Sequence, residues 1–246
     1  MLLRGRVLAY FAKVKITDTP KIRIGDAVKL IKESAKAKFD ETIDFQLRLN
    51  VDPKHGDQNV RGTCMLPGGL GKNVSIAVLT SNEFNEVALR AGADFVGQEE
   101  ILKSIKDGTY KFEKLITTQD MLIHLKPFAR LLGTKGLMPN PKAGTLVLPQ
   151  ELSTAIKGAK AGSIEFRVDS GSNLMVPVGK KSFEDKVILM NIKAFSIALN
   201  QKRPISLKGQ LIGEARIKTT MGKPVEVDVS SFDQRNKEND LKDLVY

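Results

Sequence analysis

The stretch FQLRLNV, residues 45–51, alternates apolar and polar side chains without a break. A period of two places every second side chain on the same face, which is typical of a half-buried β-strand. The same alternation returns much later in IEFRV, residues 164–168, and in VEVDV, residues 225–229. Residues 26–37 and 183–197 carry apolar side chains at helical spacing. Both ends of the chain therefore predict long alternating strands beside amphipathic helices.

The middle of the chain follows a different pattern. Residues 74–79 read VSIAVL, an apolar run that suits a strand, and short helices and strands alternate after it. This alternation implies a small parallel α/β unit. The expected helices cover residues 82–90, 99–106 and 121–132, the expected strands cover 93–96 and 115–117, and the Gly- and Pro-rich residues 133–144 are expected to be irregular.

The simplest architecture that joins the two patterns is a discontinuous domain with a second domain inserted into it. We expect residues 1–68 and 161–230 to form an α+β split domain with an antiparallel sheet and helices. Residues 69–160 are expected to form an inserted α/β three-layer domain with a small parallel sheet, and the polar residues 231–246 a frayed tail. The chain then crosses twice between the domains, and glycines near the crossings predict a hinge: Gly68, Gly69, Gly158 and Gly162.

The charge of the chain is large and uneven. The 246 residues carry 39 basic and 28 acidic side chains, a formal net charge of +11. Residues 69–160 hold 12 basic and 9 acidic side chains, residues 231–246 hold 3 and 4, and the remainder holds 24 and 15, a net of +9. Such an excess indicates a polyanionic partner, because Lys and Arg displace counterions from phosphates. Simple solubility is the alternative interpretation.

Several other chemistries are disfavoured. The loop PGGLGKN, residues 67–73, looks like a phosphate loop, but Leu66 stands where a Walker loop needs Gly and Asn73 where it needs a hydroxyl. Nothing marks Cys64 or His55 as an activated nucleophile and base. With one cysteine and two histidines the chain has too few good ligands for zinc, and no apolar run reaches the ~18 residues of a membrane span. We expect no catalytic residue, no metal, no cofactor and no membrane partner.

The first 17 residues contain four basic side chains and no acidic one. This composition suits the end of an organelle-targeting peptide. It suits a basic RNA-binding arm equally well. Both interpretations stay open at this point.

Two short clusters have a composition suited to RNA. Lys36, Lys38 and Phe39, with Thr42 following, combine basic groups for phosphates with an aromatic ring that can stack. The segment KTTMG, residues 218–222, offers two hydroxyls and a glycine that permits close backbone approach. The alternative is structural: Phe39 as a core residue, and residues 218–222 as an ordinary strand end and turn.

Taken together, six segments resemble the L-one family of large-subunit ribosomal proteins, in the order and spacing of that family. The resemblance covers about residues 26–230. The segments are AKFDET at 37–42, DQNVRGT at 57–63 with Leu66-Pro67, AGADFVG at 91–97, GLMPNPKAGT at 136–145, IEFR at 164–167 and TTMG at 219–222.

The resemblance implies a split rRNA-binding domain with an α/β insertion. It also implies a monomer within the large subunit that binds the rRNA junction of the mobile stalk, touches exit-site tRNA, assists release of deacylated tRNA and can repress its own mRNA. The implied RNA contacts are Lys36, Lys38, Phe39, Thr42, Arg167, Thr219, Thr220, Met221 and Gly222.

Two departures from the family's bacterial members concern the source of the chain. Residues 1–20 do not match the usual Lys/Arg/Tyr-rich start, and Gly68 stands where a His is typical. We therefore expect a ribosome of the mitochondrial matrix or of the bacterial cytoplasm, with a slight preference for the mitochondrial one. Two other functions compete with the ribosomal role. One is a soluble enzyme that uses the α/β domain, and the other a stand-alone translational repressor that uses the same RNA surface.

Overall fold

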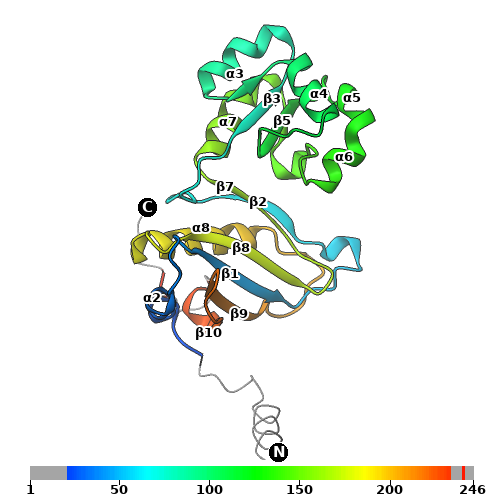
Figure 1. The fold of residues 1–246 in the computed structure, drawn as a ribbon. Helices are drawn as coiled ribbons and strands as arrows, with labels where there is room; N and C mark the ends of the chain where they lie inside the picture. Colours follow the sequence, from blue (N-terminus) through cyan, green and yellow to red (C-terminus); the bar gives the residue numbers. More distant parts are fainter. Residues whose placement is uncertain (1–20, 234–239, 242–246) are drawn as a thin grey trace, which may run out of the picture.

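The computed structural model describes residues 21–233, 240 and 241. The expectation for residues 1–20, a targeting peptide or an RNA-binding arm, lies outside them. Figure 1 shows two bodies joined by a narrow connection. The lower body contains an antiparallel sheet and the upper body a separate parallel sheet, which confirms the expected fold class.

The antiparallel sheet combines both ends of the chain: β1, from the N-terminal part, lies between two strands from the C-terminal part. Its order is β10-β9-β1-β8, with β1 at Thr42–Leu49, β8 at Asn173–Lys180, β9 at Ile212–Thr219 and β10 at Val225–Val227. Every second side chain of β1 is buried, as its alternating sequence predicts. Helices α2 (Ile24–Ser34) and α8 (Asp185–Gln201) pack their apolar sides into the same core as these buried side chains. The other face of the sheet stays open among the described residues.

A two-stranded ribbon packs on the side of α8 opposite to the sheet. It consists of β2 (Arg61–Met65) and β7 (Ser163–Arg167), paired antiparallel. Phe195 of α8 contacts a ring on each side: its centroid lies 6.2 Å from that of Phe45 in β1 and 5.5 Å from that of Phe166 in β7. Both pairs are edge-to-face, a geometry that aromatic rings favour. Helix α8 therefore fixes the ribbon to the sheet.

The upper body contains β3 (Ile76–Leu79), α3 (Asn85–Ala91), β4 (Phe95–Val96), α4 (Gln98–Lys106), β5 (Lys114–Thr118), α5 (Leu122–Leu125), α6 (Ala129–Thr134), β6 (Leu146–Val147) and α7 (Leu152–Lys160). Its parallel sheet has the order β4-β3-β5-β6 and is covered on both faces. One hydrophobic cluster joins α3 and α7 to one face, and a second joins α4, α5 and α6 to the other. Strand β3, one of the two inner strands, reads IAVL and is buried throughout, which explains why the sequence shows an apolar run there and no alternation.

Three predictions about local structure are wrong. The first helix covers Ile24–Ser34 and not residues 26–37. Gly158 lies inside α7, where helical hydrogen bonds fix its backbone, so it is no flexible hinge residue. The expectation of a frayed tail is wrong for Phe232 and Leu241, which are buried in the core; the centroid of the Phe232 ring lies 5.2 Å from that of Phe45.

The two chain crossings touch each other. A Cβ added to Gly162 would stand 2.7 Å from the Cα of Gly69, so the two backbones are in contact at this point. Both residues have positive φ angles, +103° and +65°, which side chains disfavour. We propose that the chain divides into its two domains here, as the expected limits of residues 69–160 require.

The first crossing is also tied to the split domain. The side chain of Asn191, buried in α8, accepts a hydrogen bond from Gly68 N (2.9 Å) and donates to the carbonyls of Gly69 (3.2 Å) and Val178 (2.7 Å). A Cβ on Gly68 would stand only 2.2 Å from Cγ1 of Val187. Gly68 is therefore held against α8.

Alanine substitutions at the two glycines near the second crossing should have opposite effects on the stability of the protein. Gly162→Ala should destabilise the protein by more than about 1–2 kcal/mol, because the left-handed backbone and the contact with Gly69 both oppose a Cβ. Gly158→Ala should stabilise it by about 0.5–1 kcal/mol, since it replaces a helical glycine whose added Cβ meets nothing closer than 3.7 Å. Urea unfolding of both variants measures the difference. Equal destabilisation by the two would contradict this placement.

Candidate RNA-binding surface

A groove of 630 Å³ lies at one end of the antiparallel sheet. Its walls come from opposite ends of the chain: the segment that joins α2 to β1, and the turn after β9. We call it the Phe39–Met221 groove. Its lining residues are Ser34, Lys36, Ala37, Phe39, Glu41, Met221, Gly222 and Lys223.

Two large apolar side chains are exposed to solvent at this groove. Phe39 is 54% exposed and Met221 is 74% exposed, although they come from segments separated by most of the sequence. The structural interpretation of Phe39 as a core residue is therefore wrong. Lys36, Lys38 and Lys223 are exposed around them. An aromatic ring and a thioether framed by ammonium groups form a surface for stacking beside phosphates.

The two walls are held together by a buried carboxylate. Glu41 is fully buried, and its oxygens accept hydrogen bonds from the backbone N–H of Ala37 (3.1 Å) and of Met221 (3.0 Å). The Met221 N–H is the main reason that the pKa of Glu41 is lowered; the Ala37 N–H, the Thr219 side chain and the charge of Lys181 add to this, while burial opposes it. Glu41 therefore stays charged and clamps both walls at neutral pH.

The threonines predicted as RNA contacts differ in position. The Thr42 N–H donates to Oγ1 of Thr220 (3.1 Å), and the Thr220 N–H donates to the Thr42 carbonyl (3.0 Å), so these two residues brace each other. Thr220 is exposed, but Thr219 is fully buried. A Cβ on Gly222 would stand 2.3 Å from Oγ1 of Thr219. Thr219 and Gly222 thus shape the turn that carries Met221, a packing role that sequence patterns do not reveal.

The open face of the sheet extends from the groove. Met175 of β8 is 52% exposed and faces outward beside Gln46, its partner in β1. Arg216 of β9 forms an ion pair with Glu226 at 3.0 Å. Burial raises the pKa of Asp44 in β1, and the positive charge of Lys218 partly opposes this shift. Met175 was not predicted as a surface residue because β8 was not predicted; the outward positions of a half-buried strand are the signal that would have found it.

Arg167 belongs to a different part of the surface. It lies on the ribbon, opposite Arg61 of β2, and not on the four-stranded sheet that carries the groove. Arg61 pairs with Glu165 at 2.5 Å, whereas none of the ion pairs within the described part of the chain involves Arg167. The predicted contacts therefore form two groups, one at the groove and one on the ribbon.

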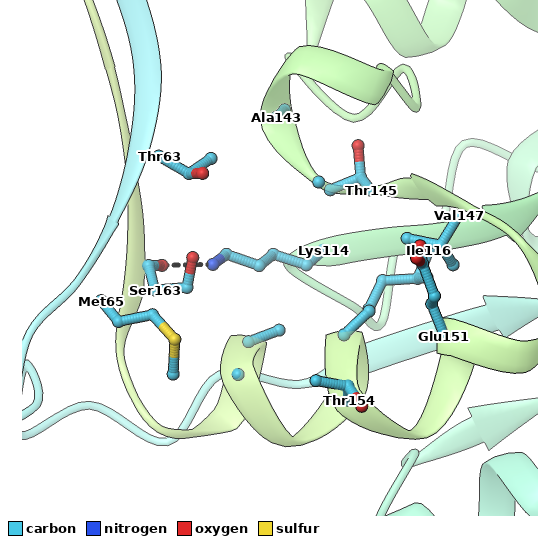
Figure 2. Close-up of a pocket in the computed structure, with 14 residues that line it drawn as sticks. Thr63, Met65, Lys114, Ile116, Ala143, Thr145, Val147, Glu151, Thr154 and Ser163 are labelled. Carbon is cyan, nitrogen blue, oxygen red and sulfur yellow. Dashed lines mark hydrogen bonds between the residues drawn. The ribbon is translucent and has the colours of Figure 1, made fainter. Parts of the chain in front are cut away.

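A second cavity, of 500 Å³, lies between the ribbon and the α/β body and was not anticipated from the sequence. Figure 2 shows Lys114 of β5 reaching across it, with Nζ 2.5 Å from the Ser163 carbonyl oxygen of β7. Burial lowers the pKa of Lys114, and the charge of Glu165 opposes this shift. The lining is mostly apolar, with Met65, Ile116 and Val147 among it. This contact ties the inserted body to the ribbon.

Comparison with known proteins identifies the family. Residues 31–223 match the model of the "Ribosomal protein L1p/L10e family", a span that includes both walls of the groove. The large ribosomal subunit proteins uL1 of two Prochlorococcus marinus strains, NATL1A and NATL2A, are each 43% identical over 213 residues, 87% of this chain and 90% of theirs. The chain belongs to the L-one family of ribosomal proteins.

Membership of the L-one family resolves several earlier alternatives. The family consists of ribosomal proteins, so the chain is not an enzyme and the α/β body is no catalytic domain. Both relatives are bacterial, which gives no support to the mitochondrial preference. Within the described residues, no three His, Cys, Asp or Glu side chains gather into a metal site. Nor is any helix there long and apolar enough to cross a bilayer.

The clamp should be visible when Glu41 is replaced. Glu41→Gln puts an amide where a carboxylate accepts two N–H groups, so one donor loses its partner. The amides of Ala37 and Met221 should then exchange hydrogen faster by about tenfold or more. Hydrogen exchange measured by NMR tests this, with Glu33→Gln, an exposed change nearby, as the control. Unchanged protection at both amides would contradict the clamp.

The same clamp predicts an acid dependence. Because the pKa of Glu41 is lowered in the folded protein, its stabilising contribution is complete above the ordinary value of 4.5 and disappears as the pH falls through the folded value. The melting temperature of the wild type should therefore fall more steeply below about pH 4.5 than that of Glu41→Gln. Parallel curves for the two proteins would contradict the assignment.

Proposed function

We propose that this constituent of the large ribosomal subunit binds large-subunit rRNA through the Phe39–Met221 groove and the adjoining open face of the sheet. One observation carries the proposal: two apolar side chains from distant segments stand exposed, are fixed by the buried Glu41 and are surrounded by lysines. The residues proposed to contact or shape the RNA site are Lys36, Lys38, Phe39, Thr42, Thr219, Thr220, Met221 and Gly222, with Arg167 on the ribbon.

The chemistry of the groove favours RNA over other anions. The Phe39 ring can stack on a splayed base or pack on a sugar, and the flexible Met221 side chain can follow an irregular surface. Lys36 and Lys38 supply phosphate contacts, while the exposed Thr220 can bond a 2′-hydroxyl. The Glu41 carboxylate would repel phosphates if it were exposed, but it is buried and its oxygens accept backbone N–H groups. These features together suit a folded rRNA junction.

We further propose that the protein forms part of the mobile stalk and assists release of deacylated exit-site tRNA. The support is mechanical. The inserted body is joined to the split domain by two crossings that touch at Gly69 and Gly162, and Lys114 contacts the ribbon. Such a connection permits a limited rotation of the inserted body relative to the split domain, but not independent diffusion as on a flexible tether. The split domain can then stay on rRNA while the inserted domain follows a tRNA.

Repression of the protein's own mRNA is a second proposal on the same surface. A groove that binds an rRNA junction would also bind an mRNA segment of similar shape. Sucrose-gradient sedimentation separates this role from the structural one. A ribosomal constituent co-sediments with large subunits after a moderate salt wash, whereas a stand-alone repressor stays at the top of the gradient.

Two substitutions should divide the RNA affinity into its apolar and ionic parts. Met221→Ala removes an exposed side chain but keeps the N–H bonded to Glu41, so it should weaken rRNA binding by about 1–3 kcal/mol without changing the salt dependence. Lys38→Ala should instead lower the slope of log affinity against log salt by about one unit. Filter binding to the stalk junction of the rRNA at several salt concentrations measures both.

The matched control is Lys111→Ala, an exposed lysine in the inserted body. It should change neither the affinity nor the slope. Gly222→Val is a poor probe of RNA contact, because the new side chain would first collide with Thr219. Full affinity in Met221→Ala and in Lys38→Ala, with intact folding, would exclude the groove as the rRNA site.

A further inference from the structure

The inserted body contains one long segment without acidic side chains. Between Met121 and Gln150 there is no Asp or Glu, while the segment contains four basic side chains. All nine acidic side chains of residues 69–160 lie before it or directly after it, ending with Asp120 and resuming with Glu151. The basic side chains of this acid-free segment are Lys126, Arg130, Lys135 and Lys142.

Part of this segment forms a helical stretch with one exposed apolar side. Helices α5 and α6, joined by a 3-10 turn at Lys126–Phe128, lie at the periphery of the upper body in Figure 1. Leu125 and Leu132 are fully buried and fasten the stretch to the sheet. On the other side, Ile123 is 65% exposed and Leu131 is 50% exposed, with the exposed Pro127 midway between them. Ile123 lies in α5 and Leu131 in α6, on either side of the 3-10 turn.

Basic side chains lie beside this apolar row and have no acidic partner in the described structure. Lys126, Arg130 and Lys135 are exposed, and no ion pair among residues 21–233, 240 and 241 involves them. Lys106 adds a further cation, 6.0 Å from the ring of Phe128. Exposed apolar side chains beside unpaired cations form a surface that is complementary to a partner with apolar groups and carboxylates. We call it the Ile123–Leu131 face.

We propose that the Ile123–Leu131 face docks an acidic amphipathic helix of a partner protein. The cations require a negatively charged partner, and the aliphatic side chains decide its class. RNA-binding surfaces stack bases on aromatic rings or Arg planes. The Phe39–Met221 groove offers the ring of Phe39, whereas the apolar side chains of the Ile123–Leu131 face are aliphatic. Ile123, Pro127 and Leu131 offer no π-face and no hydrogen bond. They gain free energy only against other apolar side chains, which a helix presents at intervals of three or four residues.

The partner helix is defined by this chemistry. Its apolar side carries aliphatic residues spaced by one turn, which pack on Ile123 and Leu131, and its flanks carry Glu or Asp opposite Lys126, Arg130 and Lys135. This inference goes beyond rRNA binding and does not depend on it, since the face lies on the inserted body and the groove on the split domain.

The test uses the full-length protein and three fluorescent probes. The first is a synthetic 18-residue helical peptide with Leu on one side and Glu on the other. The second has the same charge with Ala in place of Leu, and the third is a uridine oligonucleotide of the same charge. Fluorescence anisotropy at low and high salt gives the affinities. We expect the Leu/Glu peptide to bind at least about tenfold more tightly than the other two.

Two variants of the face should weaken the Leu/Glu peptide by about tenfold or more. One is Ile123→Ser with Leu131→Ser, and the other replaces Lys126, Arg130 and Lys135 with Glu. The matched control is Val87→Ser with Leu89→Ser on α3, where the side chains are 41% and 57% exposed in the same inserted body. It should leave binding unchanged.

The outcomes that overturn the proposal are distinct. The docking site is excluded if the Leu/Glu peptide does not bind the wild type. It is also excluded if the peptide binds the serine variant with the same affinity as the wild type. Tighter binding of the oligonucleotide, insensitive to the serine substitutions, makes the face a nucleic-acid surface. Affinity for the rRNA junction, measured on every variant, should stay at the wild-type value, which separates failure here from failure of the rRNA proposal.

Discussion

The proposed RNA surface depends on one interaction, the hydrogen-bonded buried carboxylate of Glu41. Among the described residues it is the one charged side chain that is fully buried, and its hydrogen bonds join segments 180 residues apart in the chain. A buried charge is costly unless hydrogen bonds compensate it, and two backbone N–H groups do so here. The exposure of Phe39 and Met221 is a consequence, since the clamp holds the backbone from which both project.

A second constraint explains how the fold accommodates an inserted domain. The chain leaves and re-enters the split domain at nearly one point, where Gly69 and Gly162 touch without side chains. Asn191 satisfies the backbone groups of the outgoing strand from inside α8. Because the crossings are adjacent, the insertion leaves the antiparallel core intact. The inserted body builds its own core on both faces of the parallel sheet.

Sequence patterns predicted the parts of the fold that repeat locally. The alternation of residues 45–51 and 164–168 gave β1 and β7, and the apolar run at 74–79 gave β3. Strand β8 was missed because Pro177 and Gly179 interrupt its pattern, and α7 because Gly158 looks like a linker residue. The family motifs located the groove residues, but not that Thr219 and Gly222 pack inward. That distinction depends on contacts across the sheet and turn, which no local pattern records.

The most direct test of the account removes the inserted domain. Because Gly69 and Gly162 are in contact, residues 70–161 can be replaced by a short glycine linker without stretching either crossing. The shortened protein keeps Glu41, both walls of the groove and the net +9 of the flanking parts. Its affinity for the stalk junction of the large-subunit rRNA should stay within about threefold of the full-length value. A folded split domain that fails to bind, while the isolated insertion binds fully, would contradict the central claim.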